Sequence, residues 1–443
     1  MKYIGIDIGT TTICAVCLDE EGRLLQGKTT PNFSYEDGQP FEVLQSPHSI
    51  LNSCRQLIAE ITDQFHDISA IGISNQMHGI LYVDKKGAAI SPLYTWQDER
   101  GNMRFRDEES YCMRLSRITG YSMATGFGLS THYYNCLNSC IPDGAVKLCT
   151  IGDYVAMQLC GMSVPEMHPS NAASLGLFNI ESNQFDMDAL RKANISPSIL
   201  PEITKGEKSI GMTQNGILVC TAIGDNQASV FGSLDGNSTI HINIGTSSQI
   251  SIVTDSIAAS IFMECRPYLF NKYLLVGAPL CGGYSYHILK NFFEESARIM
   301  GMNSVDNLYE KMNTAGLEAY SQDGDGLIVD TRFRGMRTAP HLRGSIKGIS
   351  SYNFSPQNLI VGMLRGICEE LYACFKSIPY SAGNQDHITA SGNGVRLNPL
   401  LIKLLEETFK RPVNIPDNRE EASVGAAKVA MWGSITSMRK DEY

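Results

Sequence analysis

The chain opens with a pattern of apolar and polar residues that is typical of two β-strands joined by a tight turn. Ile4 to Asp19 reads IGIDIGTTTICAVCLD, with apolar residues on both sides of a Gly-Thr turn. The same pattern returns from Ile240 to Asp255 as IHINIGTSSQISIVTD, and the two stretches align without gaps. Each copy predicts a β-hairpin. The repeat indicates two domains that begin alike, and we assign them to residues 1–232 and 233–443.

The stretches around the hairpins predict alternating strands and helices. After Ser46, apolar residues recur at helical spacing as far as Phe65, and the apolar run from Ile68 to Ile73 then predicts a buried strand. Further elements are expected at Ile217 to Ile223 (strand), Ile388 to Ala390 (strand), Gly392 to Gly394 (turn) and Asn398 to Phe409 (helix). This alternation is that of an α/β protein.

The Gly-Thr turns carry the first chemical signal. Such a turn exposes successive backbone N–H groups and hydroxyls, which form a concave site for phosphate oxygens. Gly9 with Thr10 and Gly245 with Thr246 occupy matching positions in the two copies. Two such turns facing each other would hold a polyphosphate. For one copy alone an ordinary hairpin is the better interpretation, but the repetition favours phosphate binding.

The acidic residue before the turn differs between the copies. Asp7 stands in the first copy where the second has Asn243. A carboxylate next to a phosphate turn is placed to hold Mg²⁺ directly or through its water ligands, because this hard cation prefers oxygen. We therefore expect a metal carboxylate in the first copy alone.

A second phosphate motif in the chain is misleading. Gly22 to Thr29 reads GRLLQGKT and fits the expression GxxxxGKT of the P-loop. A P-loop needs a strand before it and a helix that opens at Lys-Thr. This stretch instead follows a polar turn and ends at Pro31, so it predicts a third strand.

The thirteen cysteines are scattered and odd in number, which argues against a disulfide framework. Cys14 and Cys17 form a CxxC motif, but residues three apart on a strand point to opposite faces, so a redox pair is disfavoured. His132, Cys136 and Cys140 follow one another at helical spacing and would offer three metal ligands. Because no fourth ligand of a structural zinc site is evident, we interpret them as an ordinary helix face.

Composition limits the remaining classes of function. The chain has 443 residues, 43% hydrophobic and 19% charged, which suits a globular protein of two domains with a cleft between them. No apolar run reaches the ~20 residues of a membrane span, and Asp7 interrupts the apolar stretch near the start. A net charge of -10 without a basic stripe argues against nucleic acid as a partner. We expect a cytoplasmic protein without a signal peptide.

The strongest catalytic candidate lies where a strand meets a helix. Ile217 to Ile223 leads directly into Gly224-Asp225-Asn226-Gln227, and a helix follows. Asp225 would cap that helix, a role that aspartate fills well. Its place shortly before the second phosphate hairpin favours catalysis, because phosphoryl transfer to an alcohol needs a base that accepts the hydroxyl proton. We predict that Asp225 is this base.

Six motifs, taken in order, resemble one family over nearly the whole chain. They are IGIDIGTTT, SNQMHG, TWQDER, IGDNQASVFGS, INIGTSSQ and ASGNGVRLNPLL. The set resembles the FGGY carbohydrate kinases. The resemblance implies an actin-like ATPase fold of two ribonuclease-H-like domains, with Mg-ATP in the cleft between them and the sugar deeper, against the first domain. Within the family the QMH, WQD and QASV stretches most resemble the sedoheptulokinases, with the xylulokinases as the alternative.

The resemblance also implies roles for individual residues. Asp7 would serve the metal and Asp225 the proton transfer. The sugar site would be lined by Gln76, Met77, His78, Trp96, Asp98 and Arg100. The phosphates would contact Gly9, Thr10, Thr11, Gly245, Thr246 and Ser247, and the adenosine would contact Gly392, Asn393 and Gly394. A polyol needs several fixed donors and acceptors and an apolar face, which the sugar set provides.

Three departures from the family's pattern bear on activity. Cys14 stands where members usually carry Lys or Arg after the first turn, so a cationic phosphate contact is missing or is supplied elsewhere. The adenosine turn reads GNG rather than GGG, which leaves the nucleotide preference open. Gly126 to Asn135, GFGLSTHYYN, lacks the family's lysine-containing signature, which leaves the identity of the sugar open.

The sequence therefore predicts a kinase that uses ATP and Mg²⁺ to phosphorylate a ketose hydroxyl, with sedoheptulose to sedoheptulose 7-phosphate as the first candidate. A sugar or nucleotide sensor without turnover is a second interpretation, which Cys14 suits and the intact Asp7 and Asp225 oppose. An actin-like or chaperone-like ATPase is a third, but it has no reason to carry the QMH and WQD stretches. A small ketose is the expected partner, and a homodimer stays open.

Overall fold

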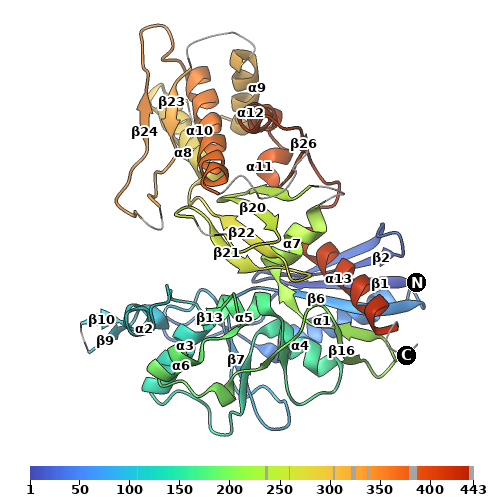
Figure 1. Ribbon diagram of the computed structural model, residues 1–443. Helices are drawn as coiled ribbons and strands as arrows, with labels where there is room; N and C mark the ends of the chain where they lie inside the picture. Colours follow the sequence, from blue (N-terminus) through green and yellow to red (C-terminus); the bar gives the residue numbers. More distant parts are fainter. Residues whose placement is uncertain are drawn as a thin grey trace. The chain divides into compact units, whose positions relative to one another are not determined.

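Two compact units make up the protein, whose computed structural model is drawn in Figure 1. The first unit comprises Met1–Gly232, Arg266–Lys272 and Glu420–Tyr443, and the second comprises Ser233–Cys265 and Tyr273–Arg419. A short segment and the C-terminal helix thus leave the second half of the sequence and pack with the first unit. The structure describes residues 1–106, 108–234, 238–258, 260–302, 305–320, 326–336, 339–378 and 387–438.

The first unit is built on a mixed sheet of seven strands, ordered β16-β17-β6-β1-β2-β3 with β18 paired to β6. β1, β17 and β18 each pair with β6 in parallel orientation, and β2 pairs with β1 in antiparallel orientation. The predicted hairpin and third strand are confirmed, since most of GRLLQGKT lies in β3 and not at the start of a helix. The strands are β1 (Lys2–Ile8), β2 (Thr12–Asp19), β3 (Leu24–Pro31), β6 (Ile68–Asn75), β16 (Ser209–Met212), β17 (Leu218–Cys220) and β18 (Ile223–Gly224).

The single strand expected before Asp225 is divided in two. Val219 pairs with Ile71, whereas Ile223 pairs with Ser74, so one extra residue is accommodated between the two pairings. An extra residue interrupts the ladder and redirects the strand. The break at this point determines where β18 ends and where the helix of Asp225 begins.

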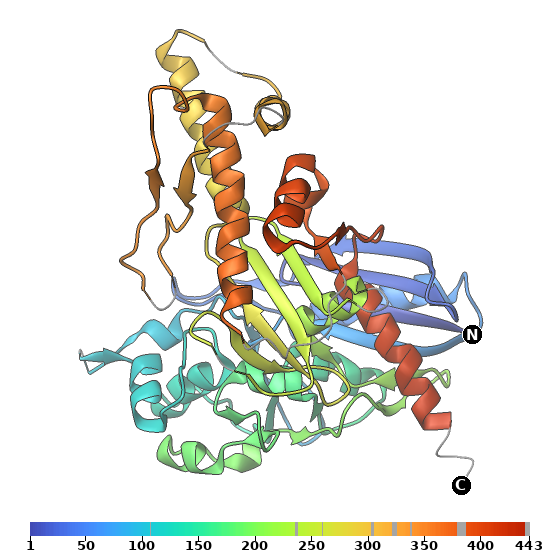
Figure 2. The same cartoon turned by 45° about the horizontal axis from the view of Figure 1, so that its top comes forward.

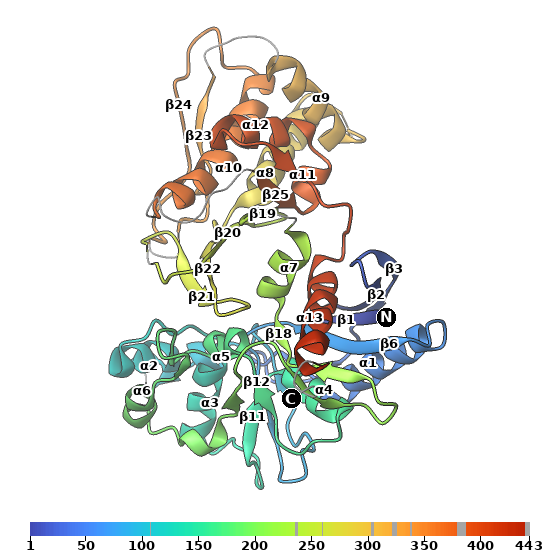
Figure 3. The same cartoon turned by 45° about the vertical axis from the view of Figure 1, so that its right-hand side comes forward.

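Helices cover both faces of this sheet. α1 and α4 pack on one face, and α13 lies along β1 and β6 on the other (Figure 3). α13 can approach this closely because Gly5 has no side chain: a Cβ there would lie 1.9 Å from Ser423 O. The helices of the first unit are α1 (Pro47–Thr62), α2 (Tyr111–Thr119), α3 (Gly128–Leu137), α4 (Ile151–Leu159), α5 (Pro169–Leu175), α6 (Met187–Lys192), α7 (Asp225–Ser233) and α13 (Glu421–Met438).

The prediction for the CxxC pair is confirmed within this unit, whereas the helix face expected for His132, Cys136 and Cys140 ends before Cys140. Cys17 packs in the core beneath α1, whereas Cys14 packs against α13, so the CxxC pair does point to opposite faces. His132 is buried on α3 and lies 2.7 Å from Tyr82 Oη and 3.4 Å from Cys136 Sγ. Cys140 lies beyond the end of α3. Across the described residues no group of three His, Cys, Asp or Glu side chains gathers to hold a metal.

A second core of the first unit forms around α2, α3, α5 and α6. It carries short two- and three-stranded ribbons, whose loops hold the predicted sugar motifs. The strands are β4 (Tyr35–Glu36), β5 (Leu44–Gln45), β7 (Leu81–Val83), β8 (Leu93–Tyr94), β9 (Arg104–Phe105), β10 (Glu109–Ser110), β11 (Lys147–Cys149), β12 (Glu166–Met167), β13 (Phe178–Asn179), β14 (Gln184–Phe185) and β15 (Glu202–Ile203).

The second unit is built on a six-stranded sheet ordered β21-β22-β20-β19-β25-β26. The long helix α10 packs on this sheet, with α8, α9 and α12 beside it (Figure 2). The strands are β19 (Ile240–Ile244), β20 (Ser248–Thr254), β21 (Glu264–Pro267), β22 (Tyr273–Gly277), β23 (Ile328–Asp330), β24 (Ser345–Lys347), β25 (Ile388–Ser391) and β26 (Val413–Asn414). The helices are α8 (Gly282–Ile299), α9 (Leu308–Tyr320), α10 (Pro356–Lys376), α11 (Asn393–Arg396) and α12 (Pro399–Phe409).

Two expectations for this unit meet different outcomes. The helix expected from Asn398 is confirmed as α12, and Asn398 caps it by accepting from the N–H groups of Leu400 and Leu401. The GNG stretch is not a free turn, because its last two residues already belong to α11. The α/β class is confirmed in both units, and no helix in the described part of the chain has the length and apolarity to cross a membrane.

Candidate active site

Three parallel strands of the first unit end next to one another. In the sheet register Asp7 of β1 lies beside Ser74 of β6, and Ser74 lies beside Ile223 of β18. The first Gly-Thr turn follows β1, Gln76 follows β6, and Asp225 follows β18. Ligand sites of α/β proteins lie at such carboxyl ends. The structure thus brings together the predicted metal residue, first phosphate turn, sugar motif and base.

Asp7 is a partly buried carboxylate at the end of β1. Its Oδ1 accepts a hydrogen bond from Ser74 Oγ at 2.7 Å. Burial raises the pKa of Asp7 to about 6; the Ser74 hydrogen bond opposes this rise and the charge of Glu420 adds to it. A carboxylate in this environment gains from a nearby cation, because a positive charge favours its ionised form.

Asp225 is the first residue of α7 and is also partly buried. Burial, together with the negative charge of Asp7, raises its pKa to about 7. The backbone N–H of Asn226 acts in the opposite direction. Two carboxylates that disfavour each other's charge at neighbouring strand ends form an arrangement typical of a functional site.

A cation reaches Asp225 from a distant part of the sequence. Arg266 lies in β21 and is the first residue of the segment Arg266–Lys272, which packs with the first unit, and its guanidinium lowers the pKa of Asp225. The segment is held by Gln227, whose Nε2 donates to Pro267 O at 3.0 Å. Cys14, at the family's usual cationic position, is buried, and burial raises the pKa of its thiol to about 12. It is a neutral residue of the core.

The first Gly-Thr turn is held by its own backbone and by one asparagine. Gly9 N–H donates to Thr12 O at 3.0 Å and closes the turn. Asn32 fixes it from the side, because its Nδ2 donates to Gly9 O at 2.9 Å and its N–H donates to Thr11 O at 2.8 Å. Thr10 is partly exposed and Thr11 is exposed, so a ligand can reach the turn.

Thr10 links this turn to the predicted sugar residues. Trp96 Nε1 donates to Thr10 Oγ1 at 2.9 Å, and Thr10 Oγ1 donates to Gln76 Oε1 at 3.3 Å. Gln76 Nε2 donates to Gln45 Oε1 at 2.8 Å, and Gln45 Nε2 donates to Thr10 O at 2.9 Å. Both glutamines are buried, whereas Trp96 is 45% exposed. The phosphate turn and an exposed indole are therefore fixed to one another.

His78 stands in a conformation that a non-glycine residue adopts at a cost, with φ of 73°. Its N–H donates to Ser174 Oγ at 3.1 Å, and its Nδ1 donates to Ser174 O at 2.7 Å, since a carbonyl oxygen can only accept. Its ring stacks on Phe127 with 4.7 Å between centroids. Met77 is buried beside Gly224, where an added Cβ would lie 2.9 Å from its sulfur.

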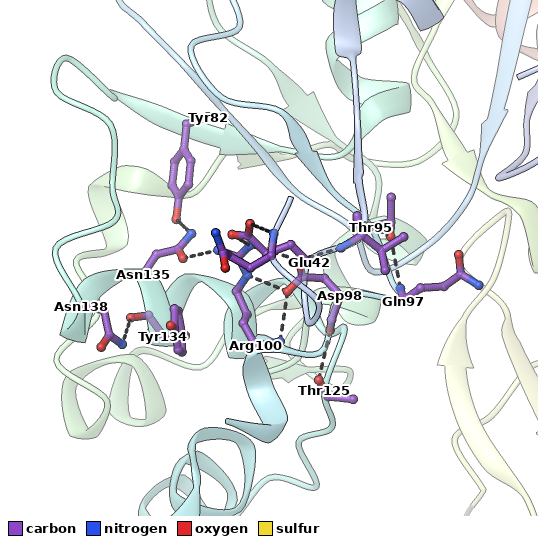
Figure 4. Close-up of polar contacts among 12 residues, drawn as sticks. Glu42, Tyr82, Thr95, Gln97, Asp98, Arg100, Thr125, Tyr134, Asn135 and Asn138 are labelled. Atoms are coloured by element: carbon purple, nitrogen blue, oxygen red, sulfur yellow. Dashed lines mark hydrogen bonds and ion pairs between the residues drawn. The ribbon is translucent and has the colours of Figure 1, made fainter. Parts of the chain in front are cut away.

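Asp98 and Arg100 form a buried cluster, drawn in Figure 4, and are 0% and 2% exposed. Arg100 Nε donates to Asp98 Oδ1 at 2.6 Å, Nη1 to Asn135 Oδ1 at 2.7 Å and Nη2 to Glu42 Oε1 at 3.1 Å. The guanidinium also lies over the Tyr94 ring, 4.1 Å from its centroid. The polar atoms of the pair are engaged by protein groups, and the cluster fixes the loop that begins at Trp96.

The segment that lacks the family's lysine supports the same loop. Gly126 has φ of 78°, and a Cβ there would lie 1.9 Å from Trp96 O. Only glycine permits this approach. Just before it, Thr125 Oγ1 donates to Asp98 O at 3.1 Å, and at its end Asn135 binds Arg100.

In the second unit the predicted nucleotide residues also lie at strand ends. Gly245 follows β19 and Gly392 follows β25, two parallel neighbours. Gly245 N–H donates to Ser247 O at 2.9 Å, and the first turn of α8 donates back to Gly245 O and Thr246 O at 2.9 and 2.8 Å. Thr246 and Ser247 are exposed.

Gly392 begins the stretch that was expected at the adenosine. It has φ of 89°, and a Cβ there would lie 2.5 Å from Ile244 O, so only glycine fits. Asn393 and Gly394 follow in α11, and Gly394 packs on the side chain of Ile244. Asn243 Nδ2 donates to Ser391 Oγ at 2.8 Å just before this stretch.

Sequence reasoning missed the residues that support the site from behind. Ser74 and Gln45 bind predicted residues directly but lie in ordinary strand sequence. Ser74 lies beside Asp7 only because the register of β1 and β6 places them opposite each other. Gln45 belongs to a strand of two residues. Neither residue is therefore marked by a local sequence motif. A polar residue at the end of an otherwise apolar strand is the one signal that could have indicated Ser74.

Comparison with known proteins relates the whole chain to one family. The sequence profile of the FGGY family of carbohydrate kinases matches residues 2–235 with its N-terminal domain and residues 240–434 with its C-terminal domain. Sedoheptulokinase of Mus musculus is 28% identical, covering 98% of this chain and 98% of that protein. Xylulose kinase of Staphylococcus xylosus is 24% identical, covering 98% and 91%. The crystal structure of Plasmodium falciparum glycerol kinase with ADP matches with a TM-score of 0.80 at 20% identity, covering 98% and 90%.

The structural match confirms the predicted fold, an actin-like ATPase fold with two sheet-containing units. The profile matches extend over both halves of the chain, as the six motifs do. The chain therefore belongs to the FGGY family of carbohydrate kinases, enzymes that transfer a phosphoryl group from ATP to a sugar.

Proposed function

We propose that this kinase phosphorylates a ketose, with sedoheptulose as substrate and sedoheptulose 7-phosphate as product. The names of its relatives support this substrate class, since sedoheptulokinases of Mus musculus and Homo sapiens are 28% and 27% identical over nearly their full length. In the proposed reaction the sugar hydroxyl oxygen attacks the γ-phosphorus of ATP, its proton passes to Asp225, and the bond to ADP breaks.

The observation that carries the proposal is that Asp7 and Asp225 stand at the ends of β1 and β18, the two strands that flank the end of β6 and its QMH motif. A base works best when its pKa lies near the pH of the reaction, and the pKa of Asp225 is raised to about 7. The carboxylate can then accept a proton at neutral pH without binding it too weakly. The two Gly-Thr turns are each proposed to bind phosphate oxygens.

Mg²⁺ fits the residues around Asp7. Burial and the negative charge of Glu420 disfavour the ionised form of this carboxylate, and a bound cation would offset both effects. Mg²⁺ usually binds through one or two carboxylates together with waters and phosphate oxygens, so one carboxylate suffices. When bound, the ion neutralises charge that develops on the phosphates. Asp7 is the residue proposed to hold it, with Ser74 fixing the carboxylate.

The proposed sugar residues divide into two sets. Trp96 is 45% exposed and His78 is partly buried, and their rings are proposed to contact a polyol. Gln76 is buried and engaged by Thr10 and Gln45, so it is proposed to act by fixing the first turn beside them. Asp98 and Arg100 are saturated by protein partners, so they are proposed to act on the sugar site through the loop that carries Trp96. Met77 supplies apolar surface beside Gly224.

The experiment that tests the proposal measures ADP release with ATP, Mg²⁺ and one sugar at a time. Sedoheptulose, xylulose, ribulose and fructose are compared at equal concentration. Sedoheptulose should give the highest kcat/KM, and omission of sugar should reduce ADP release to background. A clear preference for xylulose would instead favour the xylulokinase alternative, which the relative from Staphylococcus xylosus supports at 24% identity.

A sensor without turnover remains the competing proposal, because Cys14 is a neutral core residue where the family usually has a cation. Such a protein would bind sugar and ATP without sugar-dependent ADP release. Binding measured by calorimetry, alongside the release assay, separates the two. Binding without turnover for every sugar would overturn the kinase proposal for this chain.

A further inference from the structure

Helix α5 connects both sides of the candidate site. Its first residues reach the strand end before Asp225, because Gly224 N–H donates to Ser170 Oγ at 3.0 Å. Its last turn reaches the QMH motif, because His78 N–H donates to Ser174 Oγ at 3.1 Å. Between these, Asn171 Nδ2 donates to Asn75 Oδ1 at 3.0 Å. A seven-residue helix thus holds the ends of β6 and β18 through these hydrogen bonds, and it lies near β18 in Figure 3.

The contact with Gly224 continues into a chain of buried polar groups. His168 caps α5, and its Nδ1 lies 2.8 Å from Ser170 Oγ and 3.1 Å from Ser170 N. Its Nε2 lies 3.3 Å from Glu207 Oε1, and the two side chains are 1% and 6% exposed. Phe270 N–H donates to the same Glu207 oxygen at 2.9 Å. This series of hydrogen bonds therefore runs from Gly224 to the segment Arg266–Lys272.

Hydrogen-bonding rules give this chain a direction. A backbone N–H can only donate, so Ser170 Oγ accepts from Gly224 and has its own proton left to donate to His168 Nδ1. Nδ1 also receives Ser170 N–H, so it carries no proton, and the neutral ring is protonated at Nε2. That proton is donated to Glu207. Every donor along the chain has one acceptor.

Glu207 is suited to orient the imidazole. Burial raises its pKa, but the hydrogen bonds from His168 and from the Phe270 N–H act in the opposite direction and leave the pKa below its ordinary value. A carboxylate that stays ionised holds the Nε2 proton and fixes the tautomer. None of the side chains of Ser170, His168 and Glu207 is exposed, so a sugar or nucleotide does not contact them.

We propose that Ser170 and His168 are positioning residues for Asp225, and that with Glu207 they fix the backbone N–H of Gly224, the residue directly before this aspartate. This proposal rests on the proposed role of Asp225 as base. A base transfers a proton only within hydrogen-bond reach of the hydroxyl, and small displacements of such a group lower the rate strongly. Loss of these hydrogen bonds should therefore lower kcat and leave the KM values of the substrates nearly unchanged.

Ser170→Ala is the main test, because it removes the acceptor of the Gly224 N–H and leaves the His168–Glu207 pair. We expect kcat to fall about 10-fold to 100-fold, with the KM values of sugar and ATP changed by about twofold or less. Ser170→Thr keeps the hydroxyl and should restore most of kcat. His168→Asn keeps an acceptor at the position of Nδ1 but cannot reach Glu207, and should give an intermediate kcat.

Ser355→Ala is the matched control. Ser355 caps α10 in the second unit by accepting a hydrogen bond from the N–H of Asn358. Its replacement by alanine removes one comparable backbone contact, at a position far in sequence from Ser170, His168 and Glu207. It should lower thermal stability with kcat unchanged. If Ser170→Ala also loses only stability, the residue is merely structural and the proposal is wrong.

A double variant separates this proposal from that of the base. If Ser170 acts through Asp225, adding Ser170→Ala to Asp225→Asn should not slow the remaining turnover further. A further drop equal to that in the wild-type background would overturn the positioning role. High turnover in Asp225→Asn alone would instead overturn the base assignment. Should Ser170→Ala fail to fold, His168→Asn in both backgrounds gives the same comparison.

Discussion

In each unit a hairpin packs beside a parallel strand that carries a serine near its carboxyl end, Ser74 next to last in β6 and Ser391 last in β25. Asp7 pairs with Ser74 across β1 and β6, and Asn243 pairs with Ser391 across β19 and β25. The hydrogen bond has opposite direction in the two places. Ser74 Oγ donates to the carboxylate of Asp7 at 2.7 Å, whereas the amide of Asn243 donates to Ser391 Oγ at 2.8 Å.

This difference teaches what each copy is suited to do. The amide of Asn243 is neutral and spends its donor on the neighbouring strand, so the second copy gains a fixed turn without a charge. Asp7 is a carboxylate whose ionised form burial disfavours, so a bound cation would stabilise its charge. We therefore propose that the first copy holds a cation, whereas the second holds its turn with neutral groups.

The turns themselves also differ. Ile8 pairs with Ile13 in the first hairpin, whereas Ile244 pairs with Ser248 in the second, so the second turn is one residue shorter. The ungapped alignment of the two sequences is therefore shifted by one residue after the turn. A shift of one exchanges the two faces of a strand.

The largest expected effect tests whether the first unit alone supplies the base. Asp225→Asn keeps the shape of the side chain but removes its basicity, so kcat should fall by about 10² to 10⁴ while sugar and Mg-ATP still bind. Single-turnover kinetics and sugar binding by calorimetry measure the two quantities. Near wild-type kcat would show that another group accepts the proton.

Asp7→Asn makes the first copy like the second. It should lower kcat by about 10²-fold and raise the Mg²⁺ concentration needed for half-maximal rate, because a neutral amide is a weak ligand for this ion. Magnesium titrations of steady-state turnover measure both changes.

The exchanged double variant, Asp7→Asn with Asn243→Asp, is the control for this comparison. It should stay as slow as Asp7→Asn, because Asp225 and the QMH motif stand at the strand ends of the first unit only. Recovery of turnover in the exchanged variant would mean that either copy can hold the metal, and the contrast between them would be lost.

The glycines of the two turns give a smaller and opposite pair of effects. A Cβ at Gly9 would lie 2.9 Å from Thr12 O, whereas a Cβ at Gly245 would have Asn243 Oδ1 as its nearest neighbour, 4.0 Å away. Gly9→Ala should therefore lower the free energy of unfolding by about 1–3 kcal/mol, as overpacking does. Gly245→Ala should leave stability nearly unchanged and raise KM for ATP, if that turn holds phosphate. Urea titrations and steady-state kinetics compare them, and equal losses of stability would contradict the distinction.

Much of this arrangement could be predicted from the sequence, because it follows from local patterns. The hairpins, α1, the strand β6 and the junction at Asp225 each have a continuous signature of apolar periodicity and turn residues. The one-residue difference between the turns could not, since Gly-Thr-Thr-Thr and Gly-Thr-Ser-Ser favour similar turns and the pairing partner decides the length.

The supporting contacts were beyond prediction for a different reason. Arg100 stands in a motif that suggests sugar contact, yet its partners Glu42 and Asn135 come from distant parts of the sequence. Ser170 accepts a hydrogen bond from Gly224, which lies 54 positions further along the sequence. Such bonds depend on the packing of helices and loops, which a single sequence does not specify residue by residue.

The smallest expected effect concerns Trp96, which ties the sugar residues to the first turn. Its Nε1 donates to Thr10 Oγ1, and its indole is 45% exposed. Sedoheptulose should change the intrinsic fluorescence, because an indole that gains a polyol neighbour and loses water changes its polarity. Trp96→Phe should abolish the change and raise KM for sugar by about 10-fold, the order of one stacked and hydrogen-bonded side chain.

Trp432 provides the control, as the chain has two tryptophans. It lies on α13, 5.3 Å from Phe270 between ring centroids, and is 52% exposed. The sugar-dependent signal should survive in Trp432→Phe. Domain closure can perturb an indole at a distance, so the KM of the variants decides between contact and closure. A signal carried wholly by Trp432, with KM for sugar unchanged in Trp96→Phe, would remove Trp96 from the sugar site and leave its bond to Thr10 as a structural link of the first turn.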